Sequence, residues 1–371
     1  MRRLFIPGYY SGFSNNKMSL DIAVVLAHLT GRVLVPYRFR LPRRVPVGAP
    51  PDRTVEPMLV PDLFDLPVPY SDEYLFKTWI SVPGEVQWKW SPVVDSVFCF
   101  PAMPATGDED FHAFRNGRRH VYVLDAEQED ATDLHIRADA LANYSHFFYL
   151  DEARRREVVD LMRRMRPRQS YQAAADRIAE SLGSFNAIHV RRGDFLRNEL
   201  TKLEITRTAS VTGQEIAANL ASRMNQDEQL VVCTDGSSQE EVFAPIRQAF
   251  PNTVFLDDYL AGSSMRKVLA ELPRYDESVT ALITQLVASR ARVFAGTCFS
   301  TFTGLIHRLR GFEQHDAGFL FTHNDFVSPL VRFEQCEFQP VDDGPYSWNR
   351  IRYPLSADSY SWIREWPEAF A

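Results

Sequence analysis

The stretch Ser184-Phe-Asn-Ala-Ile-His-Val-Arg-Arg-Gly-Asp194 joins an apolar run to a cluster of charged side chains. Residues 185–190 are aromatic, β-branched or small, which is typical of a short buried strand, and Gly193 offers the flexible exit that such strands commonly need. The charges therefore follow the carboxyl end of a strand, the edge at which open α/β sheets bind ligands. The two guanidinium groups could hold a diphosphate there, or they could form surface ion pairs with neighbours such as Asp194.

Length and charge limit the class of protein. The chain has 371 residues, which exceeds the usual size of a single core and favours two domains. Its 45% hydrophobic and 12% aromatic content is that of an ordinary globular protein. A net charge of -7 argues against a nucleic-acid-binding protein and against binding to anionic membranes, because both need a basic surface. Any anion site must therefore be local.

The cysteines and the N-terminus bear on the cellular compartment. Four cysteines are far apart in the sequence and form no pair with metal-ligand or redox spacing: Cys99, Cys233, Cys298 and Cys336. Free buried thiols in a reducing compartment are the simplest interpretation. The N-terminus lacks the apolar core of a signal peptide, and no window reaches the length of a membrane-spanning helix. We therefore expect a cytoplasmic protein that does not insert into a membrane.

Strand and helix alternate along the chain in two blocks, which predicts an α/β fold with two doubly wound, Rossmann-like parallel-sheet domains. The first block opens with a strand at 3–6, a loop at 8–16, a helix at 17–29 and a strand at 32–36. Dense prolines between residues 40 and 104 predict short elements in long connections. A strand at 120–124 and helices near 151–165 and 169–182 close the block.

The second block has a more regular pattern. Its predicted strands are 186–190, 229–233, 253–256 and 292–295, and its predicted helices are 212–224, 238–250 and 278–289. Pro167 interrupts the helical pattern where the two blocks meet. We therefore expect an N-terminal domain at 1–175 and a C-terminal domain with an extension at 176–371.

Polar side chains follow other predicted strands as well. In the loop after the first strand, Gly12 allows a close backbone approach, and Asn15 and Asn16 stand where a helix begins. After the strand at 229–233, Asp235 could accept from a ribose or a base. For each of these polar residues, simple capping of the following helix is the alternative interpretation.

The last predicted strand leads into a loop of small residues and then a helix. Ser300 and Thr301 lie where a helix start would direct N–H groups and hydroxyls at a phosphate. Hydroxyl side chains at this position are also common helix caps. All these candidates follow predicted strands, so each strengthens the interpretation of the others as parts of one anion site.

Motifs in both predicted domains resemble the fucosyltransferase superfamily that includes protein O-fucosyltransferases, α1,6-fucosyltransferases and the rhizobial nodulation enzyme. In the second domain these are His189-Val-Arg-Arg-Gly-Asp194 and Gly296-Thr-Cys-Phe-Ser-Thr-Phe302. In the first they are Gly12-Phe-Ser-Asn-Asn-Lys-Met-Ser-Leu20 and Ala27-His-Leu-Thr-Gly-Arg-Val-Leu-Val35, which look most like the protein O-fucosyltransferase branch. The resemblance is more specific for the superfamily than for the acceptor.

The resemblance implies a GT-B glycosyltransferase, in which two Rossmann-like domains face a cleft and the donor is a GDP-sugar, usually GDP-fucose. It implies that Arg191 contacts the donor diphosphate as the catalytic residue. The donor-binding positions would be Gly12, Asn15, Asn16, His189, Arg191, Asp235, Ser300, Thr301 and Phe302.

Within this set the implied roles differ. Ser300 and Thr301 would hold phosphate oxygens, and Asp235 and Phe302 would lie near the nucleoside. Arg192 and Asp194 would orient Arg191, because a positioned guanidinium group needs support of its own.

The implied reaction is an inverting transfer of fucose to a hydroxyl of a protein, peptide or glycan. Negative charge grows on the leaving diphosphate, and Arg191 with a helix start at Ser300 would stabilise it more in the transition state than in the ground state. No Asp-any-Asp motif suited to holding a metal on the donor phosphates follows a predicted strand. We therefore expect neither a metal nor a cofactor beside the donor.

Several points stay open at this stage. No acceptor base is assigned, because the first loop offers amides and Asp21 lies inside the predicted helix. Thr284 and Gln285 stand where related enzymes often place an acid that reads guanine. The aromatic-rich segment 70–100 is the expected acceptor surface. A catalytically silent nucleotide-sugar-binding or scaffold protein with the same fold is the alternative function.

Overall fold

The computed structural model describes residues 2–5, 13–35, 38–39, 58–71, 87–89, 96–99, 120–123, 134–136, 148–149, 152–193, 211–275, 277–297 and 300–312. The chain divides into two compact units, and the first boundary between them along the sequence falls between Arg168 and Gln169. The sequence prediction put this boundary between residues 175 and 176. None of the helices in the described ranges combines the length and the apolar character that a membrane crossing requires.

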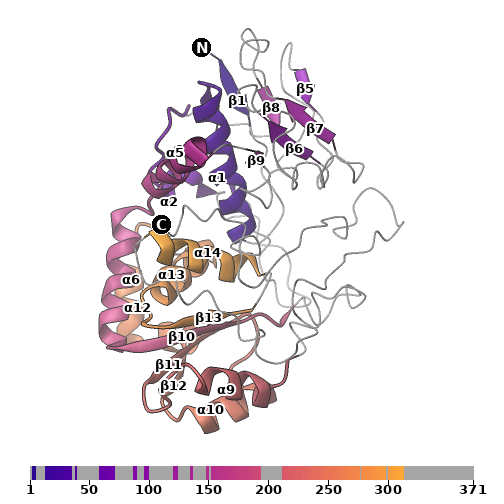
Figure 1. Ribbon diagram of the computed structural model, residues 1–371. Coiled ribbons are helices and arrows are strands. Elements are labelled where there is room, and N and C mark those ends of the chain that lie inside the picture. Colours follow the sequence, from indigo (N-terminus) through magenta and orange to yellow (C-terminus); the bar gives the residue numbers. More distant parts are fainter. Residues whose placement is uncertain are drawn as a thin grey trace, which may run out of the picture. The chain divides into compact units, whose positions relative to one another are not determined.

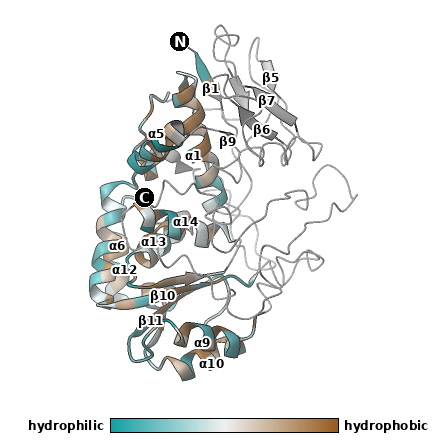
Figure 2. Ribbon diagram, in the orientation of Figure 1, coloured by the Kyte–Doolittle hydropathy of each residue, from teal (hydrophilic) through white to brown (hydrophobic). Residues whose placement is uncertain are grey.

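The first unit contains a four-stranded parallel sheet that begins with the first strand of the chain. Its strands are β1 (Arg3–Phe5), β2 (Val33–Val35), β5 (Gln87–Lys89) and β8 (Leu134–Ile136), and their order is β2-β1-β8-β5. All neighbours pair in parallel, so α1 (Phe13–Leu29) completes a βαβ unit between β1 and β2. Figure 2 shows that α1 is largely hydrophobic, in keeping with its buried side chains.

The start of α1 corrects the sequence prediction, which placed residues 13–16 in a loop. Ser14, Asn15 and Asn16 favour caps and turns, and this preference suggested a later start. In the structure Phe13 is buried and stacks on Phe64, with the ring centroids 6.4 Å apart. Tertiary packing therefore extends the helix by one turn and makes Asn15 and Asn16 helical.

The remaining elements of the first unit are short. They are a hairpin of β3 (Arg38–Phe39) and β4 (Met58–Leu59), the helix α2 (Val60–Leu63), and a parallel sheet of β7 (His120–Val123), β6 (Ser96–Cys99) and β9 (Phe148–Tyr149). The longer α5 (Glu152–Arg164) packs on α1, and His28 Nε2 lies 2.7 Å from Glu157 Oε1. The short elements expected between residues 40 and 104 are thus present, although most of the expected acceptor surface at 70–100 lies outside the described residues.

The second unit is built on a parallel sheet with the order β12-β11-β10-β13. The strands are β10 (Phe185–Val190), β11 (Gln229–Thr234), β12 (Thr253–Phe255) and β13 (Phe294–Gly296). All six residues of β10 are buried, since it lies between two neighbours and under helices on both faces. The apolar run that predicted a buried strand is therefore the central strand of the unit.

Helices cover both faces of this sheet (Figure 1). On one face are α9 (Gly213–Ala221), the short 3₁₀ turn η3 (Glu241–Phe243) and α10 (Ala244–Ala249). On the other are α6 (Gln169–Leu182), α12 (Ser263–Ala270), α13 (Glu277–Ser289) and α14 (Thr301–Phe312), while α11 (Leu256–Leu260) directly follows β12. The predicted α/β class with a doubly wound parallel sheet is confirmed.

Side chains alternate between the two faces along β10. Ile188 and Val190 join the core cluster of α9 and α10, together with Ile216 and Phe243. His189 points to the opposite face, where α14 lies. Because the period of a strand is two residues, Arg191 continues the His189 side as the chain leaves the sheet.

Two helices of the second unit, α11 and α12, were not predicted. The buried residues Met265, Val268 and Leu269 of α12 follow helical spacing, but its eight residues give a short signal. The predicted helix at 238–250 is also divided, because η3 precedes α10 and a proline occupies the first turn of α10. Thr212 caps α9 in a capping box with Glu215, so α9 begins one residue later than predicted.

Candidate functional site

Three strands of the second sheet end side by side at its carboxyl edge. In the parallel register His189 pairs with Gly296 and Val190 pairs with Thr234. The residues that follow these strand ends, Arg191, Asp235 and Thr297, therefore stand at one edge. The second sheet thus brings together Arg191 and Asp235, which the sequence predicted after separate strands.

Thr297 joins the ends of β10 and β13. Its N–H donates to the carbonyl of His189 at 3.0 Å, and its hydroxyl lies 3.2 Å from the same oxygen. The hydroxyl also accepts the backbone N–H of Arg191 at 2.8 Å. These contacts hold the backbone where Arg191 leaves the strand. Sequence reasoning missed Thr297, although its place after Gly296 and beside the end of β10 is a detectable signal.

Arg191 and Asp235 form an ion pair across two strand ends. Arg191 Nη1 lies 3.1 Å from Asp235 Oδ2, and the side chains are 27% and 7% exposed. The other oxygen, Asp235 Oδ1, accepts the backbone N–H of Arg192 at 2.8 Å. The carboxylate is thus held from two sides and orients the more exposed guanidinium group. The sequence prediction assigned Asp235 to the nucleoside, whereas the structure shows it supporting Arg191.

Arg192 turns toward a different carboxylate. Its Nε donates to Glu240 Oε2 at 3.3 Å, and Glu240 Oε1 accepts the backbone N–H of Ser237 at 3.1 Å. The orienting role expected of the Arg192 side chain is therefore carried by Asp235, and only the main chain of Arg192 takes part in it. Asp194, the other expected support, lies outside the described residues.

The structure requires a glycine at position 193 because a side chain there would collide with Asp235, and not because the chain needs flexibility after β10. A Cβ atom at this position would stand 2.2 Å from Asp235 Oδ2, which is far inside contact distance. Its φ is not in the left-handed region, which among the described glycines is occupied by Gly31 and Gly183. The glycine after the arginine pair therefore lets the Asp235 carboxylate approach the backbone.

His189 links β10 to the first turn of α14. The residue is 3% exposed, its Nδ1 shares a hydrogen bond of 2.7 Å with Thr303 Oγ1, and its ring stacks on Phe302 with centroids 4.6 Å apart. The fully buried Gln285 donates to the Phe302 carbonyl at 3.4 Å. These contacts make His189 a packing residue beneath the edge, and they direct Gln285 toward α14.

The start of α14 lies at the same edge. Ser300 is buried and its carbonyl accepts the N–H of Gly304 at 2.9 Å, so it occupies the N-cap position before Thr301. The first N–H groups of a helix have no partners within the helix and carry partial positive charge. The helix start therefore provides electrostatic attraction for an anion beside Arg191.

The first unit contains three of the positions predicted for the donor, Gly12, Asn15 and Asn16. Asn16 is 1% exposed and Asn15 is half-buried, both in the first turn of α1, while Gly12 lies outside the described residues. Asp21 is also buried and forms an ion pair with Lys17 within α1. Nothing in this arrangement makes Asp21 available as an acceptor base.

Two other groups of the second unit have strongly shifted pKa values. Burial, with a further contribution from the positive charge of Arg310, lowers the pKa of His307 to about 3. Burial raises the pKa of the Cys233 thiol, and the negative charge of Asp257 raises it further. His307 is therefore neutral and Cys233 is an unreactive thiol at neutral pH.

The chemistry available at the edge is that of an anion site. The guanidinium group of Arg191 carries a permanent positive charge and several N–H donors. Its planar fork matches two oxygens of a phosphate. Within the described ranges, no group of at least three His, Cys, Asp or Glu side chains is arranged to hold a metal ion.

Comparisons with known proteins give both structural and family matches. The structure titled POFUT1 in complex with GDP-fucose has 14% identity and a TM-score of 0.45, and the match covers 83% of this chain and 94% of that chain. Fucosyltransferase NodZ from Bradyrhizobium has 19% identity and a TM-score of 0.44, with coverage of 83% and 93%. The curated proteins contain no significant match.

The family profile described as GDP-fucose protein O-fucosyltransferase matches residues 111–313. This match covers more than half of the chain and includes β10, β11, β13 and all of α14. It confirms the resemblance that the sequence motifs indicated.

Proposed function

Because the chain belongs to the GDP-fucose protein O-fucosyltransferase family and is therefore a glycosyltransferase, we propose that it transfers fucose from GDP-fucose to a hydroxyl group of a protein, peptide or glycan. The observation that carries this proposal is the placement of Arg191. Its guanidinium group is held by Asp235, and its backbone by Thr297, at the ligand-binding edge of a parallel sheet.

The proposed reaction inverts the configuration of the sugar. The acceptor oxygen attacks the anomeric carbon of fucose while the bond from that carbon to the β-phosphate oxygen breaks. GDP leaves with the electron pair of the broken bond, and the acceptor hydroxyl gives up its proton to a general base. Arg191 and the start of α14 interact most strongly with the charge that develops on the leaving phosphate, which lowers the barrier.

We propose that this charge is stabilised without a divalent cation. Arg191 provides a full positive charge and α14 provides the partial charge of its first turn. The donor diphosphate would lie at the carboxyl edge of β10, and the first unit would provide the acceptor surface. The expected acceptor surface at 70–100 stays part of this proposal.

Donor turnover tests the proposal directly. We expect calorimetry to detect GDP binding, and we expect slow release of free fucose and GDP when GDP-fucose is supplied without an acceptor. Turnover should persist in excess EDTA, and NMR of the first fucose product should show the inverted anomer. Binding of GDP with no turnover in the presence of candidate acceptors would favour the non-catalytic alternative. Loss of turnover in EDTA that Mg²⁺ or Mn²⁺ restores would contradict metal independence.

A further inference from the structure

The second unit contains a pocket of about 400 Å³ among α11, α12 and the first turn of α13. Its volume is in the range of sites that bind small ligands. Such sites combine an apolar lining with a few polar groups that face the ligand. The lining residues that decide its chemistry are Asp257, Leu260, Arg266, Leu269, Tyr275 and Thr280.

Contacts with α6 fix the helices of this pocket. Ser181, at the end of α6, has its Oγ 2.8 Å from Tyr259 Oη of α11 and 3.7 Å from Met265 Sδ of α12. The end of α6 leads into the amino end of β10, whereas Arg191 follows the carboxyl end, about 20 Å further along this six-residue strand. The pocket therefore has its anchor away from Arg191, and none of its described lining residues belongs to the group around Arg191.

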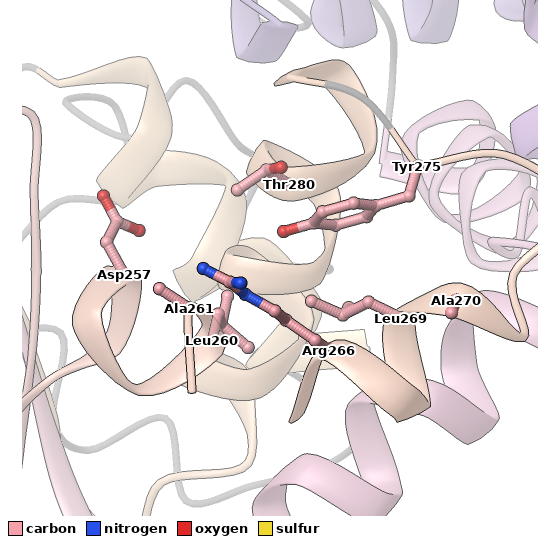
Figure 3. A pocket seen from close by; sticks show the side chains of 8 residues that line it. All are labelled: Asp257, Leu260, Ala261, Arg266, Leu269, Ala270, Tyr275 and Thr280. Atoms are coloured by element: carbon pink, nitrogen blue, oxygen red, sulfur yellow. The ribbon is translucent and has the colours of Figure 1, made fainter. Parts of the chain in front are cut away.

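Polar groups converge on the pocket from different elements. In Figure 3 the side chains of Arg266 and Tyr275 reach toward the middle of the pocket, and Asp257 lies across from Tyr275. Asp257, Arg266 and Tyr275 are all exposed. Neither Arg266 nor Tyr275 makes a hydrogen bond or ion pair with a described residue. Their polar groups can therefore bind a ligand without breaking a contact within the described part of the chain.

The charges of the lining select a neutral ligand. The negative charge of Asp257 and the positive charge of Arg266 cancel, and the other polar side chains of the described lining end in hydroxyls. An anion drawn to Arg266 would meet the carboxylate, and a cation drawn to Asp257 would meet the guanidinium group. A neutral ligand with several hydroxyl groups can use both, because the carboxylate accepts from hydroxyls and the guanidinium group donates to their oxygens.

Tyr275 adds an aromatic surface. It is 43% exposed, and the other large hydrophobic side chain exposed among the described residues is Tyr70 of the first unit. The face of an aromatic ring carries partial negative charge. The C–H groups on one face of a pyranose ring carry partial positive charge, so such a face stacks on tyrosine. The buried Leu260 and Leu269 provide apolar surface beside it.

From these observations we propose that the pocket binds a neutral pyranose sugar, at a site separate from the donor. Tyr275 stacks on one face of the sugar ring, Asp257 accepts from a hydroxyl group, and Arg266 donates to a sugar oxygen. The pocket thus holds a glycan of a partner molecule on the second unit, in addition to the donor sugar at Arg191. This inference needs the pocket alone and does not depend on the proposed fucose transfer.

Saturation-transfer NMR with methyl glycosides of glucose, galactose, mannose and N-acetylglucosamine tests the pocket. We expect at least one of these neutral sugars to bind, and glucuronate and glucosamine to bind more weakly because each carries a charge. Saturating GDP should leave this binding unchanged, since the pocket shares no described residue with the group around Arg191. Absence of binding by all four glycosides would overturn the proposal. Binding of inorganic phosphate or glucuronate in their place would show an anion site instead.

Two variants of Tyr275 test the stacking contact. Tyr275→Ala should weaken binding of the sugar about tenfold, because the ring face is lost. Tyr275→Phe is the matched control, since it keeps the ring and removes the hydroxyl, and it should retain most of the affinity. Unchanged affinity in Tyr275→Ala would overturn the proposed site.

Two further variants test the charged groups. Asp257→Asn and Arg266→Gln should each weaken binding of the sugar about tenfold. Their controls, Asp258→Asn and Lys267→Gln, remove the same charges from neighbouring exposed residues outside the described lining and should have no effect. Because all these side chains are exposed, melting temperatures should stay equal. Equal losses in the variants and their controls would overturn the assignment of Asp257 and Arg266.

The outcomes separate this inference from the proposed function. All the pocket variants should bind GDP as the unchanged protein does. If the protein binds a neutral glycoside through Tyr275 but does not turn over GDP-fucose, the proposed function fails and the sugar site stands. If it turns over GDP-fucose but binds none of the neutral glycosides, the sugar site is overturned and the proposed function stands.

Discussion

Two arginines of the second unit show how the same side chain serves different ends. Arg191 has a 27% exposed side chain and faces one carboxylate at the carboxyl edge of the sheet. Arg310 is buried, and its guanidinium group donates to the carbonyls of Ser289 at 3.0 Å, Arg292 at 3.2 Å and Ala291. Arg310 donates to the turn between α13 and β13, whereas Arg191 pairs with Asp235 where the chain leaves β10. Partner type and exposure therefore separate a binding arginine from a structural one.

Replacing Arg191 should give the largest effect. Arg191→Ala should lower kcat for fucose transfer by a factor on the order of 10² to 10³, because the leaving phosphate loses a charged contact made in the transition state. The free energy of unfolding should change by less than about 1 kcal/mol, since the side chain is partly exposed. Steady-state kinetics and urea denaturation measure the two quantities. Near-normal turnover in a folded variant would remove Arg191 from the mechanism.

Replacing Arg310 should give the opposite pattern. Arg310→Met keeps the length of the side chain but leaves buried carbonyls without their donors, which should lower the free energy of unfolding by about 3 kcal/mol. The kcat of the folded fraction should stay close to that of the unchanged protein. A variant with normal stability and lost activity would show that the contrast between the two arginines is wrong.

The support of Arg191 should matter less than Arg191 itself. Asp235→Asn keeps the size of the side chain but removes the charge that orients the guanidinium group, and kcat should fall roughly 10- to 100-fold. Glu240→Gln is the matched control, because Glu240 holds Arg192 instead. An equal loss in both variants would mean that the whole charge network, rather than the Asp235 contact, sets the rate.

The smallest predicted effect concerns pH and the inner side of α14. The pKa of His307 in the folded protein is about 3, below its ordinary value of 6.5, so below pH 6.5 the unfolded chain binds a proton that the folded chain does not. His307 should therefore reduce stability as pH falls from 6.5 toward 3, by about 1 kcal/mol between pH 7 and pH 5.5. Denaturation curves for His307→Phe should show a shallower pH dependence over this interval.

The sequence predicts the second sheet well because its strands are short apolar runs and carry their own signal. Phe185–Val190 is the clearest example, and a parallel sheet necessarily places the residues after its strands at one edge. The apolar pattern of the strands does not predict which carboxylate pairs with each arginine at that edge. Whether Arg191 meets Asp235, Asp194 or Glu240 depends on strand order and on the space that Gly193 leaves.

Local preferences were misleading where packing between distant segments decided the outcome. The polar residues after Phe13 indicated a loop, but the stacking of Phe13 on Phe64 made the segment helical. Gln285 stands at a position where the family resemblance suggests a residue that reads guanine, yet its amide donates to the carbonyl of Phe302. Such contacts join residues far apart in the chain, and a single sequence carries no direct record of them.

The position of β13 beside β10 sets the order in which the edge is completed during synthesis. Thr297, which accepts the N–H of Arg191, lies 106 residues further along the chain, and α14 follows it. When β10, β11 and β12 have left the ribosome, Asp235 has been synthesised and can pair with Arg191. Thr297 and the start of α14 have not yet been synthesised. Translation at roughly 5–20 residues per second leaves this edge incomplete for several seconds. The ability to hold a donor is therefore acquired late, once the chain through α14 has emerged.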